Sequence, residues 1–319
     1  MRHRKTGGDS RLDDAARAGW LYYVAGNTQD EIAAKLGISR QSAQRLVSLA
    51  VSEGLVKVRL DHPLAVCLEL AVQLRERFGL AFCEVVPTDP ASDSTTLGVA
   101  EAAAAEIERR LKSPDIKVMA IGTGRTLKAA GELLPPIDAL DKKIVSLTGN
   151  FAPDGSATFY SVIFTMADVV NAPHYPMPVP VIASSPEERH LLHQQVMVHS
   201  TLELAAQADV TFLGIGELTP NAPLLQDGFI SKDELAALRD AGAVTEIIGW
   251  AFDAEGRLIE GLTNARVTSA PLPSTKTSLV IAVAKGEPKL SGIRIAVSRH
   301  LVNGLITDEW TAKKLLSSS

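Results

Sequence analysis

From residue 82 onward, short apolar runs alternate with longer segments of helical periodicity, and this alternation constrains the fold more than any other feature. Such alternation is typical of parallel strands joined by crossover helices. The expected strands are residues 82–86, 117–121, 144–147, 210–215, 279–284 and 305–307. The helices expected among the first of these strands are residues 95–111, 125–134 and 156–167. We therefore predict an α/β domain with a doubly wound, mostly parallel sheet covered by helices on both faces.

The N-terminal part of the chain has a different pattern, in which helical segments follow one another without strands. The expected helices are residues 12–25, 28–36 and 39–53. Thr28 and Glu31 form a capping box at the start of the second helix, because each side chain can accept a bond from a free backbone N–H group. Gly37 permits the tight turn after this helix, and Ser39 caps the third. A short helix, a tight turn and a longer helix are the order found in a helix-turn-helix.

The third of these helices has one apolar face and one polar face. The apolar positions are Ala43, Leu46, Val47 and Ala50. The polar positions are Arg40, Gln41, Gln44, Arg45 and Ser48. Arginine can bind guanine, glutamine can bind adenine, and serine can bind phosphate. An amphipathic helix pair whose polar face is only solvated is the alternative interpretation. Helix order, turn and side-chain chemistry together favour DNA binding, with the candidates Thr28, Gln29, Ser39, Arg40, Gln41, Gln44, Arg45 and Ser48.

Charge is distributed unevenly along the chain. Residues 1–60 carry a net charge of +4, and the remainder carries −9, although the whole chain has only −5. Because phosphate binding needs local positive charge, a basic head on an acidic body is consistent with a DNA-binding module joined to a domain with another task. Residues 55–60 are predicted to form a strand of a small wing. The expected organisation is a helix-turn-helix domain at 1–60, a linker helix within 61–80 and an effector-binding and oligomerisation domain at 81–319.

Glycines follow several of the predicted strands, where an open parallel sheet binds its ligands. Gly122-Thr-Gly-Arg-Thr126 follows the second strand and precedes a helix, so bare backbone, hydroxyls and a helix N-terminus suit a phosphate. Residues 212–217 and 282–289 add two similar strand ends. A strand followed by Gly-x-Gly equally describes a turn that needs positive φ. It lacks the third glycine of a dinucleotide motif and the Lys-Ser/Thr of a P-loop, so we expect neither NAD nor ATP.

Several stretches resemble the SorC family of sugar-responsive bacterial transcriptional regulators. In the head these are residues 21–40, LYYVAGNTQDEIAAKLGISR, and residues 52–58, SEGLVKV. In the body they include Gly122-Thr-Gly124, Thr148-Gly-Asn150, Asn171-Ala-Pro173, Gly214-Ile-Gly-Glu-Leu218 and Gly304-Leu-Ile-Thr-Asp-Glu309. The resemblance covers most of residues 12–316. It implies a body fold similar to glucosamine-6-phosphate deaminase and ribose-5-phosphate isomerase.

The resemblance also implies function. The third helix would read double-stranded operator DNA, and a sugar phosphate or sugar alcohol bound by the body would control genes of carbohydrate catabolism. A homodimer or homotetramer is expected, because one head alone makes too few contacts for tight specific binding. The strand ends and the family motifs together give the effector-binding candidates Gly122, Thr123, Gly124, Arg125, Thr126, Thr148, Gly149, Asn150, Gly214, Gly216, Glu217, Lys285, Gly286, Lys289 and Asp308.

Two departures from the family pattern bear on the effector. The family usually has two glycines where this chain has Lys285 and Gly286, and the added cation either strengthens or blocks phosphate binding. Some members carry a lysine near the position of Thr148 that forms a Schiff base with an aldehyde. Residues 145–150 contain no lysine, so we expect non-covalent binding.

Catalytic and metal-binding interpretations are weaker. Asp308 and Glu309 could act as acid and base, but Asp308 precedes the last predicted helix, where a capping role is expected. His174 and Tyr175, in a Pro-rich segment expected to be a loop at 172–180, are candidates to line a pocket. We assign no catalytic residue. A sugar-phosphate isomerase or deaminase with an N-terminal extension, and a protein-interaction adaptor, remain the alternatives.

The remaining features exclude other classes of protein. Cys67 and Cys83 form no CxxC pair and lie in no cluster with metal-ligand spacing, so neither a metal nor a cofactor is expected. No apolar run approaches the length of a membrane-spanning helix. We therefore expect a cytoplasmic protein without a membrane partner.

Overall fold

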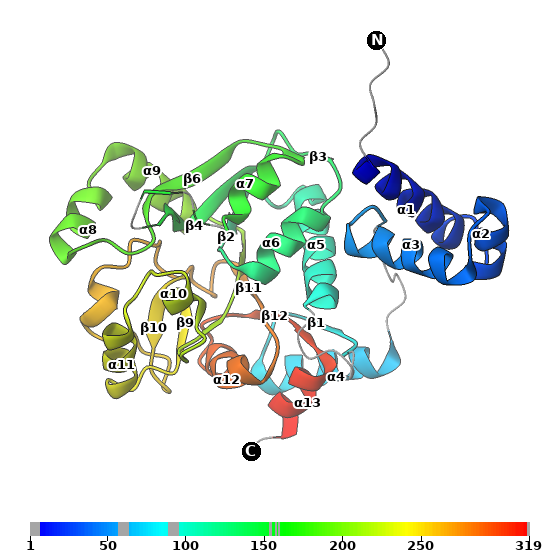
Figure 1. The fold of residues 1–319 in the computed structure, drawn as a ribbon. Coiled ribbons are helices and arrows are strands. Elements are labelled where there is room, and N and C mark those ends of the chain that lie inside the picture. The colour runs from blue at the N-terminus through cyan, green and yellow to red at the C-terminus, as the bar shows by residue number, and fades with distance from the viewer. Residues whose placement is uncertain are drawn as a thin grey trace, which may run out of the picture. The chain divides into compact units, whose positions relative to one another are not determined.

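The structure is a computed structural model that describes residues 7–56, 64–88, 96–152, 155, 156, 158 and 160–317, with side chains from Arg11 onward. The chain divides into two compact units, residues 1–62 and residues 63–319, here called the head and the body (Figure 1). Each unit is described by itself. Within the described ranges no helix is both long and apolar enough to cross a membrane.

The head consists of three helices, as the sequence predicts. They are α1 (Gly7–Tyr23), α2 (Gln29–Leu36) and α3 (Arg40–Ser52). The predicted capping box is confirmed, since the backbone N–H of Thr28 donates to the Glu31 carboxylate at 2.7 Å and the N–H of Glu31 donates to the Thr28 hydroxyl at 3.3 Å. Gly37 ends α2 with a φ of 65°, and the Ser39 hydroxyl accepts a bond from the Ser42 N–H. These caps fix the turn between α2 and α3.

The core of the head lies where the three helices meet. Ala43 and Val47 of α3 are buried against Ala18 of α1 and Ile32 of α2, and Leu46 is partly buried beside them. The predicted apolar stripe of α3 therefore faces inward. Of the predicted wing strand, Leu55 and Val56 lie in a bend, and residues 57–60 lie outside the described residues.

Gly19 is the point of closest approach between α1 and the end of α3. A Cβ atom there would lie 2.7 Å from the Ala50 Cβ and 2.6 Å from the Val56 Cγ2. We expect Gly19→Val to destabilise the head by about 1–3 kcal/mol, because overpacking forces the helices apart. The midpoint of the first unfolding transition of the full chain in urea measures this. Arg17→Ala, an exposed position on the same helix, is the matched control; an equal loss in both variants would contradict close packing at Gly19.

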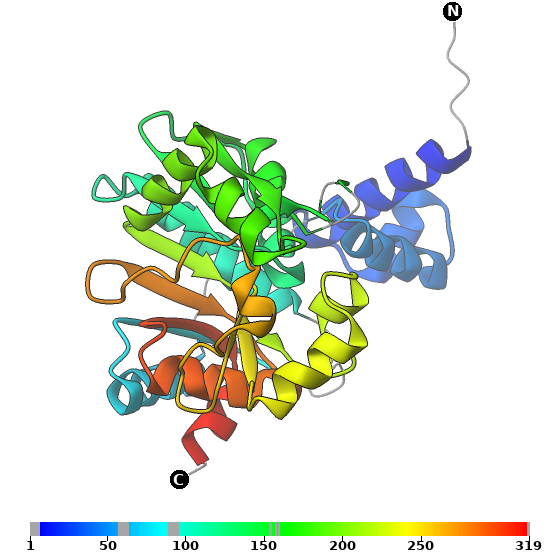
Figure 2. The ribbon, with the colours of Figure 1, turned by 90° about the vertical axis from the view of Figure 1, so that its left-hand side faces the viewer.

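A seven-stranded sheet forms the centre of the body. Its strands in chain order are β1 (Phe82–Val86), β2 (Val118–Ile121), β4 (Lys143–Phe151), β6 (His174–Pro180), β7 (Val210–Leu213), β11 (Leu279–Val283) and β12 (Gly304–Asp308). Their spatial order is β1-β12-β11-β7-β2-β4-β6, and all neighbours run parallel. The predicted parallel α/β sheet is confirmed. Figure 2 shows β11, in orange, beside β12, in red.

Helices cover both faces of the sheet, because alternate strand residues point to opposite sides. Met119 and Ile121 of β2 join one buried cluster, and Val118 and Ala120 join the other. The first face carries α5 (Leu97–Lys112), α6 (Arg125–Leu133) and α7 (Val162–Ala167) (Figure 1). The second face carries α4 (Ala65–Phe78), α9 (Val196–Ala206), α12 (Leu290–Ser298) and α13 (Glu309–Ser317). The predicted linker helix is thus α4, whose buried side belongs to the core of the body.

Smaller elements complete the body. An antiparallel sheet contains β8 (Gly216–Glu217), β9 (Thr245–Ile247) and β10 (Trp250–Phe252), in the order β10-β9-β8. A further pair joins β3 (Ile137–Asp138) to β5 (Val170–Asn171). The remaining helices are α8 (Pro186–His193), α10 (Pro223–Gln226), α11 (Lys232–Asp240), and the 3-10 helices η1 (Leu262–Ala265) and η2 (Glu287–Lys289).

Two predictions about the middle of the body are wrong. The Pro-rich segment expected as a loop at 172–180 contains β6, which pairs with β4 at the edge of the sheet, where prolines without an N–H are tolerated. The helix expected from residue 156 begins only at Val162, because the N–H of Ala152 donates to the Ser156 carbonyl and the N–H of Thr158 donates to the Asn150 carbonyl. These bonds fold the chain back on the end of β4.

Candidate DNA-binding face and effector site

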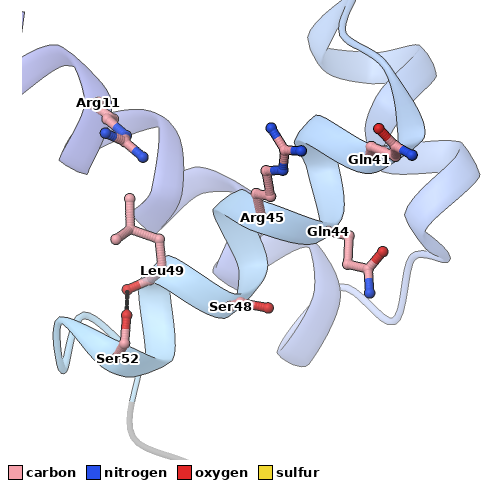
Figure 3. Close-up of a pocket in the computed structure, with 7 residues that line it drawn as sticks. All are labelled: Arg11, Gln41, Gln44, Arg45, Ser48, Leu49 and Ser52. Carbon is pink, nitrogen blue, oxygen red and sulfur yellow. Dashed lines mark hydrogen bonds between the residues drawn. The ribbon is translucent and has the colours of Figure 1, made fainter.

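The polar face of α3 lines an open pocket on the head. Gln41, Gln44, Arg45 and Ser48 lie at helical spacing on this face and are exposed. Figure 3 shows them with Leu49 and Ser52 of the same helix and with Arg11, which comes from α1. The Ser52 hydroxyl donates to the Leu49 carbonyl at 3.2 Å. The pocket therefore combines guanidinium, amide and hydroxyl groups, the chemistry that reads base edges and binds phosphate.

The other predicted DNA-binding residues have different surroundings. Arg40 is not among the residues that line the pocket, and its Nε lies 3.5 Å from the Asp30 Oδ1 on α2. Thr28 and Ser39 use their hydroxyls as helix caps, and Gln29 is the first residue of α2. Arg11 was not among the candidates. Its basic charge was visible in the sequence, but no pattern within α1 indicated that this side chain would face the polar side of α3.

In the body, the sheet changes its direction of winding between β2 and β7. The chain leaves β2 toward β4 on one side, and it leaves β7 toward β11 on the other side. A topological switch point of this kind is where an open α/β sheet binds ligands. Gly122 follows β2 and Gly214 follows β7. A Cβ on Gly122 would lie 3.3 Å from the Leu213 Cα, so the two glycine turns lie side by side at the switch point.

The turn after β2 leads directly into α6. Gly124 caps this helix with a φ of 137°, which L-residues rarely adopt, so the glycine meets a backbone requirement as well. The Thr123 hydroxyl donates to the Tyr160 carbonyl, and the Arg125 guanidinium lies 5.4 Å from the centre of the Tyr160 ring. The backbone N–H groups of Arg125 and Thr126 lie in the first turn of α6, which has a partial positive charge.

Charged side chains from three predicted strand ends meet near this turn. Burial lowers the pKa of Lys289; the carboxylates of Glu246 and Glu217 oppose this effect, whereas the charge of Arg125 adds to it. Burial raises the pKa of Glu246, against the N–H of Gly249 and the charge of Lys289. Arg125, Glu217 and Lys289, which come from three different predicted strand ends, therefore form one charged cluster with Glu246.

Glu246 is a member of this cluster that sequence reasoning missed. It reaches the cluster through the antiparallel pairing of β8 with β9, which aligns Gly216 with Glu246. A Cβ on Gly216 would lie 1.8 Å from the Glu246 Oε1, so only glycine leaves room for this carboxylate. The Gly-x-Gly pattern of residues 214–216 is the one feature of the sequence that pointed to a close approach here.

Lys285 and Asp308 form an ion pair at the ends of β11 and β12. The Lys285 Nζ lies 3.4 Å from the Asp308 Oδ2, and the two side chains are 11% and 5% exposed. The other oxygen of Asp308 accepts the Thr311 N–H at 2.9 Å, which confirms the predicted capping of the last helix. The Gly286 N–H donates to the Thr311 hydroxyl at 2.9 Å. The ammonium group of Lys285 is thus held by a carboxylate of the protein itself.

The three residues of the motif at 148–150 differ in whether their polar groups already form hydrogen bonds within the protein. The Asn150 amide is occupied, since it donates to the Ser161 hydroxyl at 3.0 Å and accepts the Met177 N–H at 2.7 Å. Gly149 permits close contact with β6, where a Cβ would lie 2.3 Å from the Pro180 carbonyl oxygen. Thr148 is different. Its hydroxyl is buried and has no hydrogen-bond partner among the described residues, and the same holds for the Glu217 Oε2.

His174 and Tyr175 lie away from these strand ends. They align with Ile144 and Val145, at the amino end of β4, whereas the glycine turns follow the carboxyl ends of β2 and β7. They are therefore not part of the candidate effector site, and their role in lining a pocket stays a prediction. Among the described residues, no group of three or more His, Cys, Asp or Glu side chains has the arrangement of a metal site.

Comparison with known proteins identifies the family. A family model described as a putative sugar-binding domain matches residues 62–317. The erythritol catabolism regulatory protein EryD of Brucella abortus is 34% identical over 302 residues, covering 95% of this chain and 96% of that protein. The transcriptional regulator LsrR of Klebsiella pneumoniae is 31% identical over 312 residues, covering 95% and 92%.

Solved structures agree with this relationship at the level of the fold. The full-length sorbitol operon regulator SorC of Klebsiella pneumoniae superimposes with a TM-score of 0.71 at 22% identity, covering 97% of this chain and all of that one. The sequence relatives are named as regulators, which confirms the predicted regulator over the isomerase or deaminase alternative. The chain belongs to the SorC family of sugar-responsive transcriptional regulators.

Proposed function

We propose that the head binds double-stranded operator DNA through α3, and that the body binds a small neutral polyol without a covalent bond at the switch point between β2 and β7. The protein acts as a homodimer or homotetramer that controls genes of carbohydrate catabolism. Polyol binding favours one arrangement of the protomers and so changes the spacing of their recognition helices.

The operator proposal rests on the pocket lined by α3. Gln44 and Arg45 line this pocket and are exposed, and a helix placed in the major groove presents side chains of this kind to base edges. One head offers few such groups. Paired half-sites read by paired heads supply the contacts that specific binding requires.

The Glu217 carboxylate carries the polyol proposal. Its Oε2 is buried without a hydrogen-bond partner among the described residues, and an ionised carboxylate can only accept hydrogen bonds. A polyol brings hydroxyl donors to this oxygen. The relative EryD is named for the catabolism of erythritol, a four-carbon polyol.

The charge balance of the cluster supports a neutral effector over a phosphate. The Lys285 ammonium pairs with Asp308, and the negative charges of Glu217 and Glu246 act on the Lys289 ammonium. A phosphate dianion would offer no hydrogen-bond donor to the Glu217 carboxylate, and the negative charge of that carboxylate would repel it. The Arg125 side chain and the α6 N-terminus favour a phosphate, which makes a sugar phosphate the competing effector.

Thermal unfolding of the purified protein in the presence of candidate effectors tests the proposal. Erythritol, xylitol, ribitol and sorbitol are compared with erythritol 4-phosphate and ribose 5-phosphate. A ligand at a hundred times its Kd stabilises the native state by about 2.7 kcal/mol, which raises the melting temperature. A rise with a polyol alone supports the proposal. A rise only with phosphorylated compounds, or with none of them, would overturn it.

Arg11 provides a prediction about the DNA contact. Because it lines the α3 pocket from α1 and is exposed, we expect it to contact backbone phosphate rather than a base. In a plot of the logarithm of the DNA-binding constant against the logarithm of salt concentration, Arg11→Ala should make the negative slope less steep by about 0.9. It should also weaken binding to all sequences alike. Binding measured by fluorescence anisotropy at several salt concentrations gives this slope. Arg17→Ala, exposed on α1 outside the pocket, is the control; equal slopes for Arg11→Ala and wild type would contradict the assignment.

A further inference from the structure

The loop that follows β11 is fastened to the start of α13 by two contacts from consecutive residues. Lys285 pairs with Asp308, and the backbone N–H of Gly286 donates to the Thr311 hydroxyl. Asp308 and Thr311 are themselves joined, since the Thr311 N–H donates to the second oxygen of Asp308. The loop continues into η2, which carries Lys289 of the charged cluster. The segment that carries Lys289 is thus joined through Lys285 and Gly286 to the start of α13.

The last helix in turn packs on the first helix of the body. Ala312 and Leu315 of α13 share a buried cluster with Cys67 and Leu74 of α4 (Figure 1). The Arg77 guanidinium near the end of α4 donates to the Leu316 carbonyl. Helix α4 begins at Ala65, and the head ends at residue 62, so α4 is the element from which the chain passes to the DNA-binding unit.

We infer that the Lys285–Asp308 pair is a clamp that couples the effector site to α13 and α4, and that Lys285 is a positioning residue rather than a contact to the effector. The inference rests on the proposed function for the identity of the site, and it adds the route by which occupancy changes the head. Both members of the pair are nearly buried. Separating a buried pair leaves an uncompensated charge, so the clamp moves as a unit and does not loosen gradually.

The clamp is tested in the full-length protein by Lys285→Met, Asp308→Asn and the double variant, with Lys285→Arg as the conservative control. Asparagine keeps an oxygen for the Thr311 N–H, so the helix cap survives, and the double variant leaves no unpaired buried charge. Two quantities are measured. The first is the rate of amide hydrogen exchange in α13, α4 and α11 of the ligand-free protein. The second is the ratio of operator affinities with and without saturating erythritol.

The clamp predicts faster exchange in α13 and α4 of Lys285→Met with no change in α11, which packs beside the 3-10 helix η1. It also predicts that the affinity ratio falls about tenfold, toward one, while the Kd for erythritol changes less than about threefold. Lys285→Arg keeps the affinity ratio of the wild-type protein. In the double variant the affinity ratio falls no further than in either single variant, because all three variants remove the same interaction.

Other results would overturn the clamp. A tenfold loss of erythritol affinity in Lys285→Met with an unchanged ratio would make Lys285 an effector contact. Unchanged exchange in α4 would show that the pair does not act on that helix. If wild-type protein binds none of the polyols, the proposed effector is wrong, and the exchange measurement on ligand-free protein still decides the clamp.

Discussion

Arg45→Ala is expected to weaken specific operator binding by about 1–3 kcal/mol and to relax the sequence preference at one base pair. Arg45 is exposed on the α3 face that lines the pocket, and it forms no ion pair with any residue in the described part of the chain. Its guanidinium is therefore available for two hydrogen bonds to a guanine edge. An operator fragment selected from a random duplex library, titrated by fluorescence anisotropy beside single-base variants, measures both effects.

Arg40→Ala is the matched control for this prediction. Arg40 begins the same helix, but it lies outside the pocket and near the Asp30 carboxylate. We expect its loss to cost less than about 1 kcal/mol, as is usual for an exposed ion pair. If Arg40→Ala abolished sequence preference and Arg45→Ala did not, the reading face of α3 would have to be reassigned.

Glu217→Gln is expected to weaken polyol binding by about 1.5–3 kcal/mol, roughly the contribution of a hydrogen bond to a charged group. The substitution keeps the shape of the side chain and removes the charge from the unpartnered Oε2. Operator affinity in the absence of polyol should remain at the wild-type value. Isothermal titration of the full-length variant with the polyol that shifts the wild-type melting temperature gives the change.

Glu260→Gln is the control for Glu217→Gln, because Glu260 is an exposed carboxylate on a loop of the same unit. Its polyol affinity should equal that of wild type. If wild type and Glu217→Gln bound the polyol with equal affinity, the Glu217 carboxylate would not contact the effector, and the argument for a neutral effector would fail. An increase in affinity for phosphorylated sugars in Glu217→Gln would show instead that this carboxylate discriminates against them.

The strands of the body were predictable because a sheet covered on both faces makes each strand a short continuous apolar run. Residues 118–121 and 210–213 are buried throughout and were identified from this pattern. The pattern failed for β6, in which Pro176, Pro178 and Pro180 interrupt the apolar residues. Only its place at the edge of the sheet, a tertiary property, makes a strand of such composition possible.

The candidate effector site was predictable where it is formed by turns and not where it is formed by pairing. The turns at Gly122 and Gly214 were identified because they follow predicted strands, where an open parallel sheet binds its ligands. Glu246 belongs to the site because β9 pairs with β8, and no local sequence pattern predicts this pairing. Lys285 and Asp308 were each assigned to the effector, but they contact one another. Their partnership depends on β12 lying beside β11.

The central claim is that occupancy of the body changes the affinity of the head for DNA. The most direct test is the Kd of the full-length protein for its selected operator, measured with and without a saturating concentration of the polyol that stabilises it. The account predicts a change of about 5- to 150-fold, and a matching change in polyol affinity when operator is bound, as linkage requires. A polyol that raises the melting temperature but leaves the operator Kd unchanged would contradict it, because a ligand with equal affinity for both states regulates nothing.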